Sequence, residues 1–136
     1  MYYYSVYGPR EADYGPYSTV IRRFKQRIDM NEPLEIFGNG SKQRDFTHVK
    51  DIAKANLLAM TSEKVGAGEV INIGNSDNRS VNQIAAMIGG PTVTVDPVVE
   101  PRETLANNSK AKNLLGWSPS VIIEEWVPKY KKDLGI

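Results

Sequence analysis

The chain has 136 residues, 40% of them hydrophobic, and 17 Lys and Arg residues against 16 Asp and Glu residues give a net charge of +1. This size suits one domain over residues 1–136, and the scattered basic residues exclude the one-signed surface of a typical nucleic-acid-binding protein. The absence of cysteine excludes disulfides, and a single histidine argues against a transition-metal site.

The hydrophobic residues are spread along the chain. No apolar run approaches the roughly twenty residues of a membrane-spanning helix, and no basic-then-apolar leader opens the sequence. We therefore expect a cytoplasmic protein that contacts neither membranes nor nucleic acids.

The N-terminal segment predicts a strand, a loop and a helix. Met1–Val6 is aromatic and β-favouring, and the turn Gly8-Pro9 ends it. A loop is expected over residues 11–16, and apolar residues at helical spacing predict a helix over residues 18–30. The basic residues of that helix, which we interpret as a solvated face, are Arg22, Arg23, Lys25 and Arg27.

The middle of the chain alternates strand and helix signals. Leu34–Phe37 predicts a strand, and residues 45–49 a further extended piece. Apolar spacing predicts a helix from residue 49 to about residue 61, and after a turn at 65–68 a strand is expected over Glu69–Ile73.

The last third begins with a helix start signal. Ser80 and Gln83 form a capping-box pattern, and the helix is expected to end at Gly89-Gly90. A strand over Thr92–Val95 and a proline-rich loop over Asp96–Pro101 should follow.

Two helices are predicted at the C-terminus. Asn107 or Asn108 should cap a short one that Gly116 closes. Pro119-Ser120 should open the last, which Pro128 should kink or split. The predicted fold class is α/β, with short strands and helices packed as one layer pair and the site on loops at one end.

Three motif blocks carry a family resemblance. They are Tyr-Gly-Pro-Arg at Tyr7–Arg10, the stretch Leu34–Asp51 with its glycine turn and Arg-Asp-Phe, and Ser109–Trp117. In this order and spacing they resemble the C-terminal, substrate-binding part of extended short-chain dehydrogenases/reductases, in the branch of the NAD-dependent nucleotide-sugar epimerases and dehydratases that is UDP-glucose 4-epimerase-like. The resemblance implies a small substrate-binding domain.

Two features of that family are missing. Gly38 and Gly40 follow a strand, but Arg44-Asp45-Phe46 comes next instead of a helix, so they do not form a dinucleotide fingerprint. The resemblance implies a catalytic Tyr four residues before a Lys, and none of the seven tyrosines has that neighbour. We therefore expect the N-terminal Rossmann half to lie upstream of Met1, no catalytic residue in this chain, and no NAD bound by it alone.

Arg44 is the first candidate for substrate binding, because a guanidinium can pair bidentately with a diphosphate. The alternative is a structural ion pair with Asp45 or Asp51. Phe37 and its neighbour Glu35 stand where the resemblance implies contacts around a uracil, with a core role for Phe37 as the alternative.

Further candidates lie near the N-terminus. Thr19 and Val20 begin a helix, whose free amides favour an anion, although a plain helix start is the alternative. By resemblance, Ser5 reaches towards the sugar or phosphate, and Tyr3 and Val6 line the nicotinamide side. A core-strand role is the alternative for these three.

Glu100 and Arg102 lie in a loop that, by resemblance, closes over the nucleotide. Relatives begin this loop with Arg-Pro-Gly and an acid, whereas Pro97-Val98-Val99-Glu100 stands here. Glu100 is therefore a candidate for binding ribose, and the phosphate contact of the missing arginine would require Arg102 to turn inwards.

The remaining conspicuous residues are assigned structural roles. His48 is interpreted as packing, and Asp51 as a helix-start carboxylate favoured by the helix dipole. Trp117 and Trp126 should anchor the C-terminal helices.

The leading hypothesis is the nucleotide-sugar-binding part of an NAD-dependent epimerase or dehydratase, which grips a UDP- or dTDP-hexose and is inactive and monomeric alone. The alternative is a free-standing binding module that complements a separate cofactor-binding chain. The aromatic strand over residues 1–6 argues mildly against independence, since a lone domain would expose it. An unrelated small α/β protein would need three coincident motif blocks.

Overall fold

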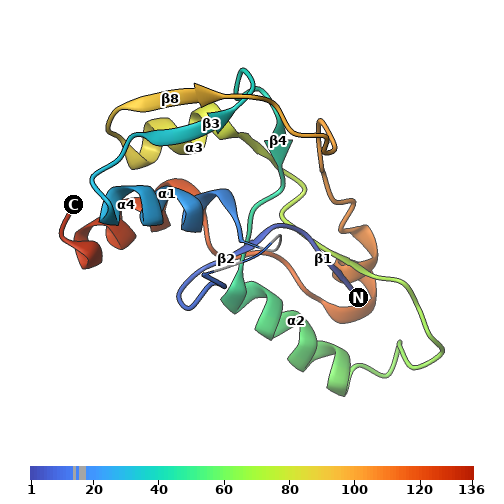
Figure 1. Ribbon diagram of the computed structural model, residues 1–136. Helices are drawn as coiled ribbons and strands as arrows, with labels where there is room; N and C mark the ends of the chain where they lie inside the picture. The colour runs from blue at the N-terminus through green and yellow to red at the C-terminus, as the bar shows by residue number, and fades with distance from the viewer. Residues whose placement is uncertain (14, 16–17) are drawn as a thin grey trace.

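The structure is a computed structural model that describes residues 1–13, 15 and 18–136. It shows an α/β fold with two groups of elements, which Figure 1 separates clearly. The first group holds β3 (Leu34–Phe37), β8 (Thr92–Val95), α1 (Val20–Asp29), α3 (Val81–Ile88) and α4 (Ile123–Leu134). The second holds β1 (Tyr2–Tyr3), β2 (Val6–Tyr7), β5 (Thr47–His48), β6 (Asn72–Ile73), α2 (Val49–Thr61) and the π-helix η1 (Ala111–Leu115). Between them run β4 (Gln43–Arg44) and β7 (Arg79–Ser80).

The strands are short and pair two by two. β3 and β8 are parallel, with Leu34 opposite Thr92 and Phe37 opposite Val95. β1 pairs with β6 and β2 with β5, also in parallel, whereas β4 and β7 are antiparallel. Because parallel strands need a long crossover, each of the three parallel pairs joins segments distant in the sequence.

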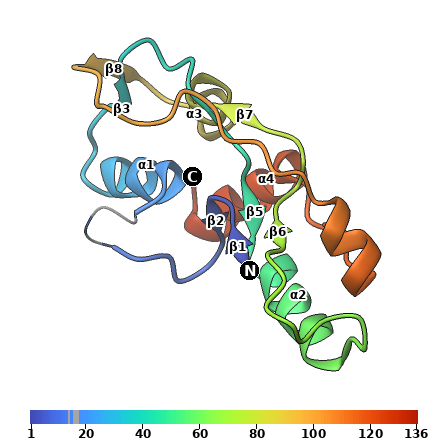
Figure 2. The same ribbon diagram turned by 90° about the vertical axis from the view of Figure 1, so that its right-hand side faces the viewer.

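Two hydrophobic clusters support the two groups. The first packs α1, α3 and α4 under β3, around the buried rings of Tyr7, Phe24 and Phe46. The second surrounds Trp117 with apolar residues of α2, β6 and η1. In the perpendicular view α2 and η1 again lie together, away from β3 and β8 (Figure 2).

Elements with strong local signals form as predicted. α1 lies within the predicted helix, and α2, β3 and β8 match their expected bounds. The capping box of α3 is present, with the Ser80 hydroxyl accepting from the Gln83 amide at 3.1 Å and the Gln83 side chain accepting from the Ser80 amide at 2.7 Å. Gly116 closes η1 with φ 64°, the left-handed conformation that glycine adopts readily.

Several predicted bounds are wrong. The strand expected over Met1–Val6 is broken between β1 and β2, where Ser5 has φ 23°. The strand expected over Glu69–Ile73 shortens to β6, because its partner β1 pairs only with Asn72 and Ile73. In the predicted loop 11–16, Tyr14 and Pro16 lie outside the described residues.

The C-terminal region departs in three places. The predicted cap of η1 is wrong, because Lys110 is its N-cap and no side chain caps it. Asn107 accepts from the Ser109 amide at 3.1 Å, and the Asn108 side chain donates to the Gly74 carbonyl. The last helix begins at Ile123 instead of Ser120, because Asp51 binds the Ser120 and Val121 amides in an extended turn. Pro128 does not split α4, which runs through it to Leu134.

Candidate functional site

A cleft of about 470 Å³ lies between the two groups of elements. It collects residues from five separate segments of the chain. They are Ser5, Val6, Ser18, Thr19, Val20, Arg23, Arg44, Phe46, Val81 and Glu100. Six of the ten residues predicted from the sequence therefore come together here: Ser5, Val6, Thr19, Val20, Arg44 and Glu100.

Arg44, in β4, lines this cleft, and its side chain is 18% exposed. Its Nη2 lies 3.4 Å from Glu100 Oε2, and Lys42 Nζ lies 3.4 Å from the other oxygen, Oε1. Arg44 Nη1 donates to the Gln43 carbonyl at 2.7 Å. The guanidinium is thus held at the cleft by Glu100, and the ion pair considered with Asp45 or Asp51 is not formed.

Those two aspartates bind backbone amides instead. Buried Asp45 accepts from the amides of Asn75, Ser76 and Ala106 at 2.8, 2.9 and 3.0 Å. Asp51, in the first turn of α2 as predicted, accepts from the Ser120 amide and hydroxyl at 3.0 and 2.6 Å and from the Val121 amide at 3.0 Å. Both carboxylates therefore fix loops by accepting from their backbone amides.

The start of α1 forms one wall. Thr19 is the N-cap: its hydroxyl accepts from the Arg22 amide at 3.4 Å and donates to Glu11 Oε2 at 3.0 Å. Burial raises the pKa of Glu11, which also accepts from the Gly8 amide. The Thr19 side chain is therefore committed to the cap, and the first-turn amides of α1, which have no partner within the helix, remain the groups available to an anion.

Of the site residues predicted in the first strands, Ser5 and Val6 line the cleft and Tyr3 does not. Ser5 lies at the break between β1 and β2, where its positive φ places it in the cleft beside Val6. Tyr3 lies outside the cleft, 46% exposed, and its hydroxyl donates to Asn56 Oδ1 at 2.8 Å. The break redirects the chain, so alternate residues no longer share one face.

Phe37 and Glu35 line a neighbouring hollow of about 250 Å³ instead of the cleft itself. Arg23 lines both spaces, and its guanidinium carbon lies 5.1 Å from the centre of the Phe37 ring. Glu35 pairs with Arg27 at 3.1 Å. The hollow and the cleft are therefore adjacent, with Arg23 between them.

Arg102 does not line the cleft. Its carbonyl accepts from the Gln43 amide at 2.9 Å, and the next contact of this segment is the Thr104 amide donating to the Gln43 carbonyl at 3.1 Å. The loop thus runs beside β4 through backbone contacts, and the Arg102 side chain is exposed. The inward turn considered for Arg102 is not seen.

The sequence interpretation missed Arg23, Phe46, Val81 and Ser18 as lining residues. Arg23 was assigned to the solvated face of its helix, but it lies one turn after Thr19 and so shares the face that begins at the cleft. The four-residue spacing between Thr19 and Arg23 therefore indicated that both side chains lie on the cleft side of the helix. Phe46 and Val81 offered none, because any buried apolar residue resembles them in the sequence.

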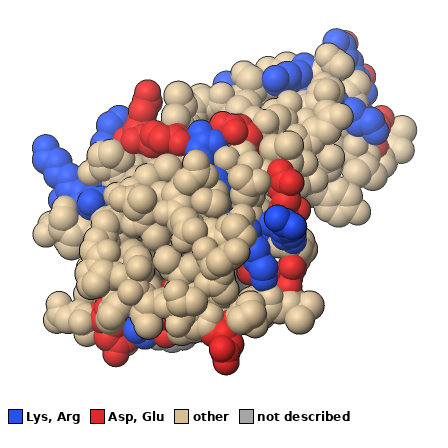
Figure 3. Space-filling view, turned by 90° about the horizontal axis from the view of Figure 1, so that it is seen from above, with Lys and Arg blue, Asp and Glu red and all other residues tan. Residues whose placement is uncertain are grey.

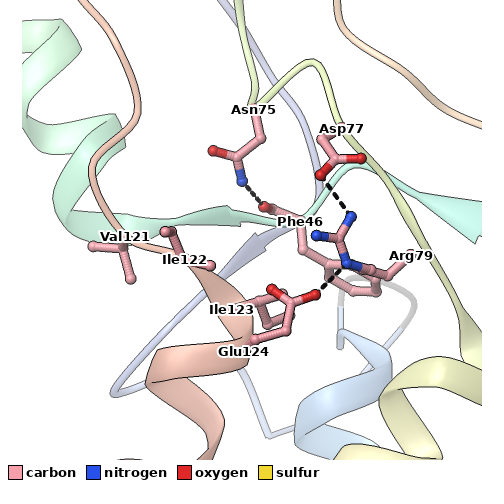
Figure 4. Close-up of a pocket in the computed structure, with 8 residues that line it drawn as sticks. All are labelled: Phe46, Asn75, Asp77, Arg79, Val121, Ile122, Ile123 and Glu124. Carbon is pink, nitrogen blue, oxygen red and sulfur yellow. Dashed lines mark hydrogen bonds and ion pairs between the residues drawn. The ribbon is translucent and has the colours of Figure 1, made fainter.

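A second, smaller pocket of about 150 Å³ shares Phe46 with the cleft (Figure 4). Arg79 lies there between Asp77, at 2.7 Å, and Glu124, and its hydrogen bond lowers the pKa of Glu124. The Asn75 side chain donates to the Phe46 carbonyl. These charged groups pair with one another, and the ion pairs connect α4 to β7 and to the loop before β7.

Charge on the surface is mixed. Seen from above, Lys and Arg side chains lie among Asp and Glu side chains without a one-signed patch (Figure 3). Within the described ranges, no group of three His, Asp or Glu side chains could hold a metal ion. No helix of the described part is long and apolar enough to cross a membrane.

His48 has the packing role predicted for it. It is 2% exposed, between the rings of Tyr7 at 5.2 Å and Trp126 at 5.6 Å, and its Nδ1 accepts from the Lys50 amide at 3.1 Å as the N-cap of α2. Burial lowers the pKa of His48 from its usual 6.5. The neutral ring is thus the form that the fold requires.

Stability should therefore fall in mild acid. Because the folded-state pKa of His48 is below its unfolded value, its contribution is present above about pH 6.5 and is lost as the pH falls towards the folded pKa. We expect a lower free energy of unfolding at pH 5.5 than at pH 7.5 in urea titrations. His48→Asn retains a capping oxygen without the titration, so its smaller pH dependence is the control. Equal pH dependence in both proteins would contradict the assignment.

Comparisons with known proteins show which family the chain is similar to. The family model of the "NAD dependent epimerase/dehydratase family" matches residues 1–74. A UDP-glucuronate 4-epimerase of Thermodesulfobacterium geofontis is 35% identical, over 90% of this chain and 38% of the relative. A UDP-N-acetyl-alpha-D-glucosaminuronate decarboxylase of Bacillus cytotoxicus is 43% identical over 83 residues, which are 61% of this chain and 25% of the relative.

Solved structures show the same similarity. The UDP-glucuronic acid 4-epimerase of Bacillus cereus, in complex with UDP-glucuronic acid and NAD, superposes with a TM-score of 0.84 at 33% identity, over 97% of this chain and 44% of that one. The UDP-glucose 4-epimerase of Thermotoga maritima, with UDP-glucose, gives 0.81 at 36% identity, over 97% and 45%. The chain thus spans less than half the length of these relatives. Its sequence and its fold place it in the NAD dependent epimerase/dehydratase family.

Proposed function

We propose that this chain supplies the nucleotide-sugar-binding part of an NAD-dependent epimerase, decarboxylase or dehydratase, and that its ligand is a UDP- or dTDP-hexose. The observation that carries the proposal is Arg44, a fixed guanidinium in a cleft of about 470 Å³ beside the start of α1. A guanidinium and free helix amides are two groups that bind phosphate in proteins. Relatives of known structure bind UDP-sugars.

The cleft offers a distinct place for each part of such a ligand. Arg44 would pair with the diphosphate, and Glu100, displaced from Arg44, would accept from ribose hydroxyls. The hollow at Phe37 and Glu35 would take the base, because an aromatic ring and a polar side chain border it. Ser5 and Val6, which also line the cleft, would face the hexose.

NAD does not fit the glycine turn of this chain. Gly38 and Gly40 lead into β4, not into a helix, and the first turn of α3 beside Gly40 uses its Asn82 amide to donate to the Gly40 carbonyl at 3.1 Å. A Cβ on Gly40 would lie 2.0 Å from Asn82 Oδ1, which shows that this glycine allows close packing against α3. Val6 and Tyr3 therefore remain, at most, contacts at the edge of a cofactor held by other residues.

We further propose that the chain alone is inactive. Its sequence holds no tyrosine with a lysine four residues later, the acid/base pair that the resemblance implies. Binding of the non-reacting nucleotide would still contribute to catalysis in a complete enzyme, because it positions the reacting carbon of the sugar.

A second arrangement is favoured by the exposed strand β1. Tyr2 and Tyr3 are 64% and 46% exposed, and β1 pairs with β6 on one side only among the described strands. Such an edge suits pairing with another β element. The chain would then complement a separate cofactor-binding chain, a proposal that a co-purification experiment with candidate partners can test.

Titration of the labelled protein with UDP-glucose tests the proposed function. Backbone amide shifts are expected at Thr19, Val20, Phe37, Arg44 and Glu100, and none of these should move with NAD alone. An absence of amide shifts with UDP-glucose would contradict the nucleotide-sugar assignment. Shifts with NAD would contradict the cofactor assignment.

Arg44→Met should weaken UDP-glucose binding about ten- to a hundredfold, since a hydrogen-bonded ion pair contributes about 1.5–3 kcal/mol. Isothermal titration calorimetry measures the change. Lys112→Met removes the same charge from the exposed surface of η1 and should leave the affinity unchanged. Equal affinities of Arg44→Met and the parent protein would remove Arg44 from the site.

A further inference from the structure

We propose that Arg23 is a second phosphate-binding residue of the cleft and that it gives the site its preference for nucleoside diphosphates over monophosphates. This inference rests on the proposed nucleotide function. It concerns a residue of the α1 surface that neither the motifs nor their spacing assigned to the site.

Arg23 differs from the other basic residues of α1 in its ion pairing. Three of the four basic residues of this helix bind carboxylates: Arg22 pairs with Asp13, Lys25 with Asp29, and Arg27 with Glu32 and Glu35. Among the described residues, no carboxylate pairs with Arg23. Its charge is therefore available to a ligand, whereas the other three are used within the fold.

The position of Arg23 is set by packing instead. Its guanidinium lies over the Phe37 ring, 5.1 Å from the ring centre, a geometry that attracts a cation to the face of an aromatic ring. The preceding turn of the helix ends at Thr19 and Val20, which line the same cleft. Stacking thus restricts the guanidinium plane and leaves its edge N–H groups free to donate.

Arg23 also lies where the cleft meets the neighbouring hollow. It lines the cleft that contains Arg44 and the hollow that contains Phe37 and Glu35. A nucleotide with its base in the hollow and its diphosphate at Arg44 would pass Arg23 between the two. Arg23 would therefore meet the phosphate nearer the base or bridge both phosphates, with Arg44 on the other side.

Charge balance supports a second cation. A diphosphate ester carries one negative charge on each phosphate, and Arg44 is partly neutralised by Glu100 at 3.4 Å. One guanidinium pairs bidentately with one phosphate group. Arg44 and Arg23 together match two phosphates, whereas a monophosphate would satisfy one arginine and leave the other without a partner.

The test compares UDP and UMP as probes by calorimetry. Arg23→Met should weaken UDP binding about tenfold, the effect of one partly exposed charged hydrogen-bonding group, and should reduce the preference for UDP over UMP by a similar factor. Arg23→Lys retains the charge but not the planar fork, so its affinity should lie between the two. Lys25→Met removes a charge from the same helix outside the cleft and should change neither affinity.

The outcomes distinguish a failure of this inference from a failure of the proposed function. Loss of UDP binding in Arg44→Met but not in Arg23→Met would overturn this inference and leave the proposed function intact. An equal loss for UDP and UMP in Arg23→Met would also overturn it, because the discrimination would not depend on Arg23. If the parent protein binds neither probe, the proposed function fails together with it. An unchanged urea midpoint of Arg23→Met shows that a loss of binding is not a loss of fold.

Discussion

Replacing Asp45 by alanine is expected to lower the free energy of unfolding by about 3–5 kcal/mol. Asp45 is fully buried and accepts from the backbone amides of Asn75, Ser76 and Ala106. Alanine would leave these donors without an acceptor, and an unsatisfied buried donor costs about 1–3 kcal/mol. Gly74 packs so closely here that a Cβ on it would lie 2.9 Å from Asp45 Oδ2, so the carboxylate fills the space between these segments.

The same substitution should weaken ligand binding. Asp45 follows Arg44 directly, its own amide donates to the Thr104 hydroxyl at 3.2 Å, and it fixes Ala106 in the segment that leads from Glu100. Loss of this junction would free both partners of the Arg44–Glu100 pair.

Urea unfolding followed by circular dichroism measures the stability of the Asp45 variants. Asp45→Asn should also be destabilising, because its amide group faces donors where an acceptor is needed. Asp133→Ala, an exposed change in α4, should remain within about 0.5 kcal/mol of the parent. A comparably small effect of Asp45→Ala would show that Asp45 does not hold the three segments together.

Local signals predicted much of this fold. The helical spacing of α1 and α2, the capping box of Ser80 and the glycine at 116 specify structure within one or two turns, so they survive in the folded protein. β3 was also predictable, because a short apolar run between Pro33 and a glycine turn has few other solutions.

Long-range contacts determined the rest. The N-terminal strand breaks at Ser5, where the Ser5 carbonyl accepts from the Thr47 amide at 3.2 Å, a pairing of segments forty residues apart. The start of α4 moves from Ser120 to Ile123 because Asp51 takes the amides that would have begun the helix. Neither partner can be identified from the residues near it in sequence.

The site, like the fold, was predictable only in part. Arg44, Glu100 and the start of α1 were assigned from resemblance, and the structure brings them together, although their role in binding stays a prediction. Arg23 was missed because its helix face also looked like solvated surface. Tyr3 and Arg102 were placed by strand and loop position, which do not fix the direction of a side chain once the strand breaks or the loop pairs through its backbone.

Trp117→Ala is the other substitution with a large expected effect, about 3–5 kcal/mol of unfolding free energy. Trp117 is fully buried in the second hydrophobic cluster, and its Nε1 donates to the Asp51 carbonyl at 2.8 Å. Its removal would leave a cavity between α2 and η1 and would loosen the residue whose carboxylate holds Ser120 and Val121. One side chain thus joins the apolar core of this group to the polar turn that precedes α4.

A graded series separates these two contributions. Trp117→Phe retains most of the ring but not the N–H, so it should cost about 1–2 kcal/mol, the share of the hydrogen bond and a small void. Trp126→Ala removes the same side-chain type where it is only half-buried and stacked on Tyr130 at 4.5 Å, and should cost less than Trp117→Ala. If Trp126→Ala proved the more damaging of the two in urea titrations, α4 and the first cluster would carry the stability of the chain. In the expected order, the packing of Trp117 in the second cluster contributes more to stability than the stacking of Trp126 on Tyr130.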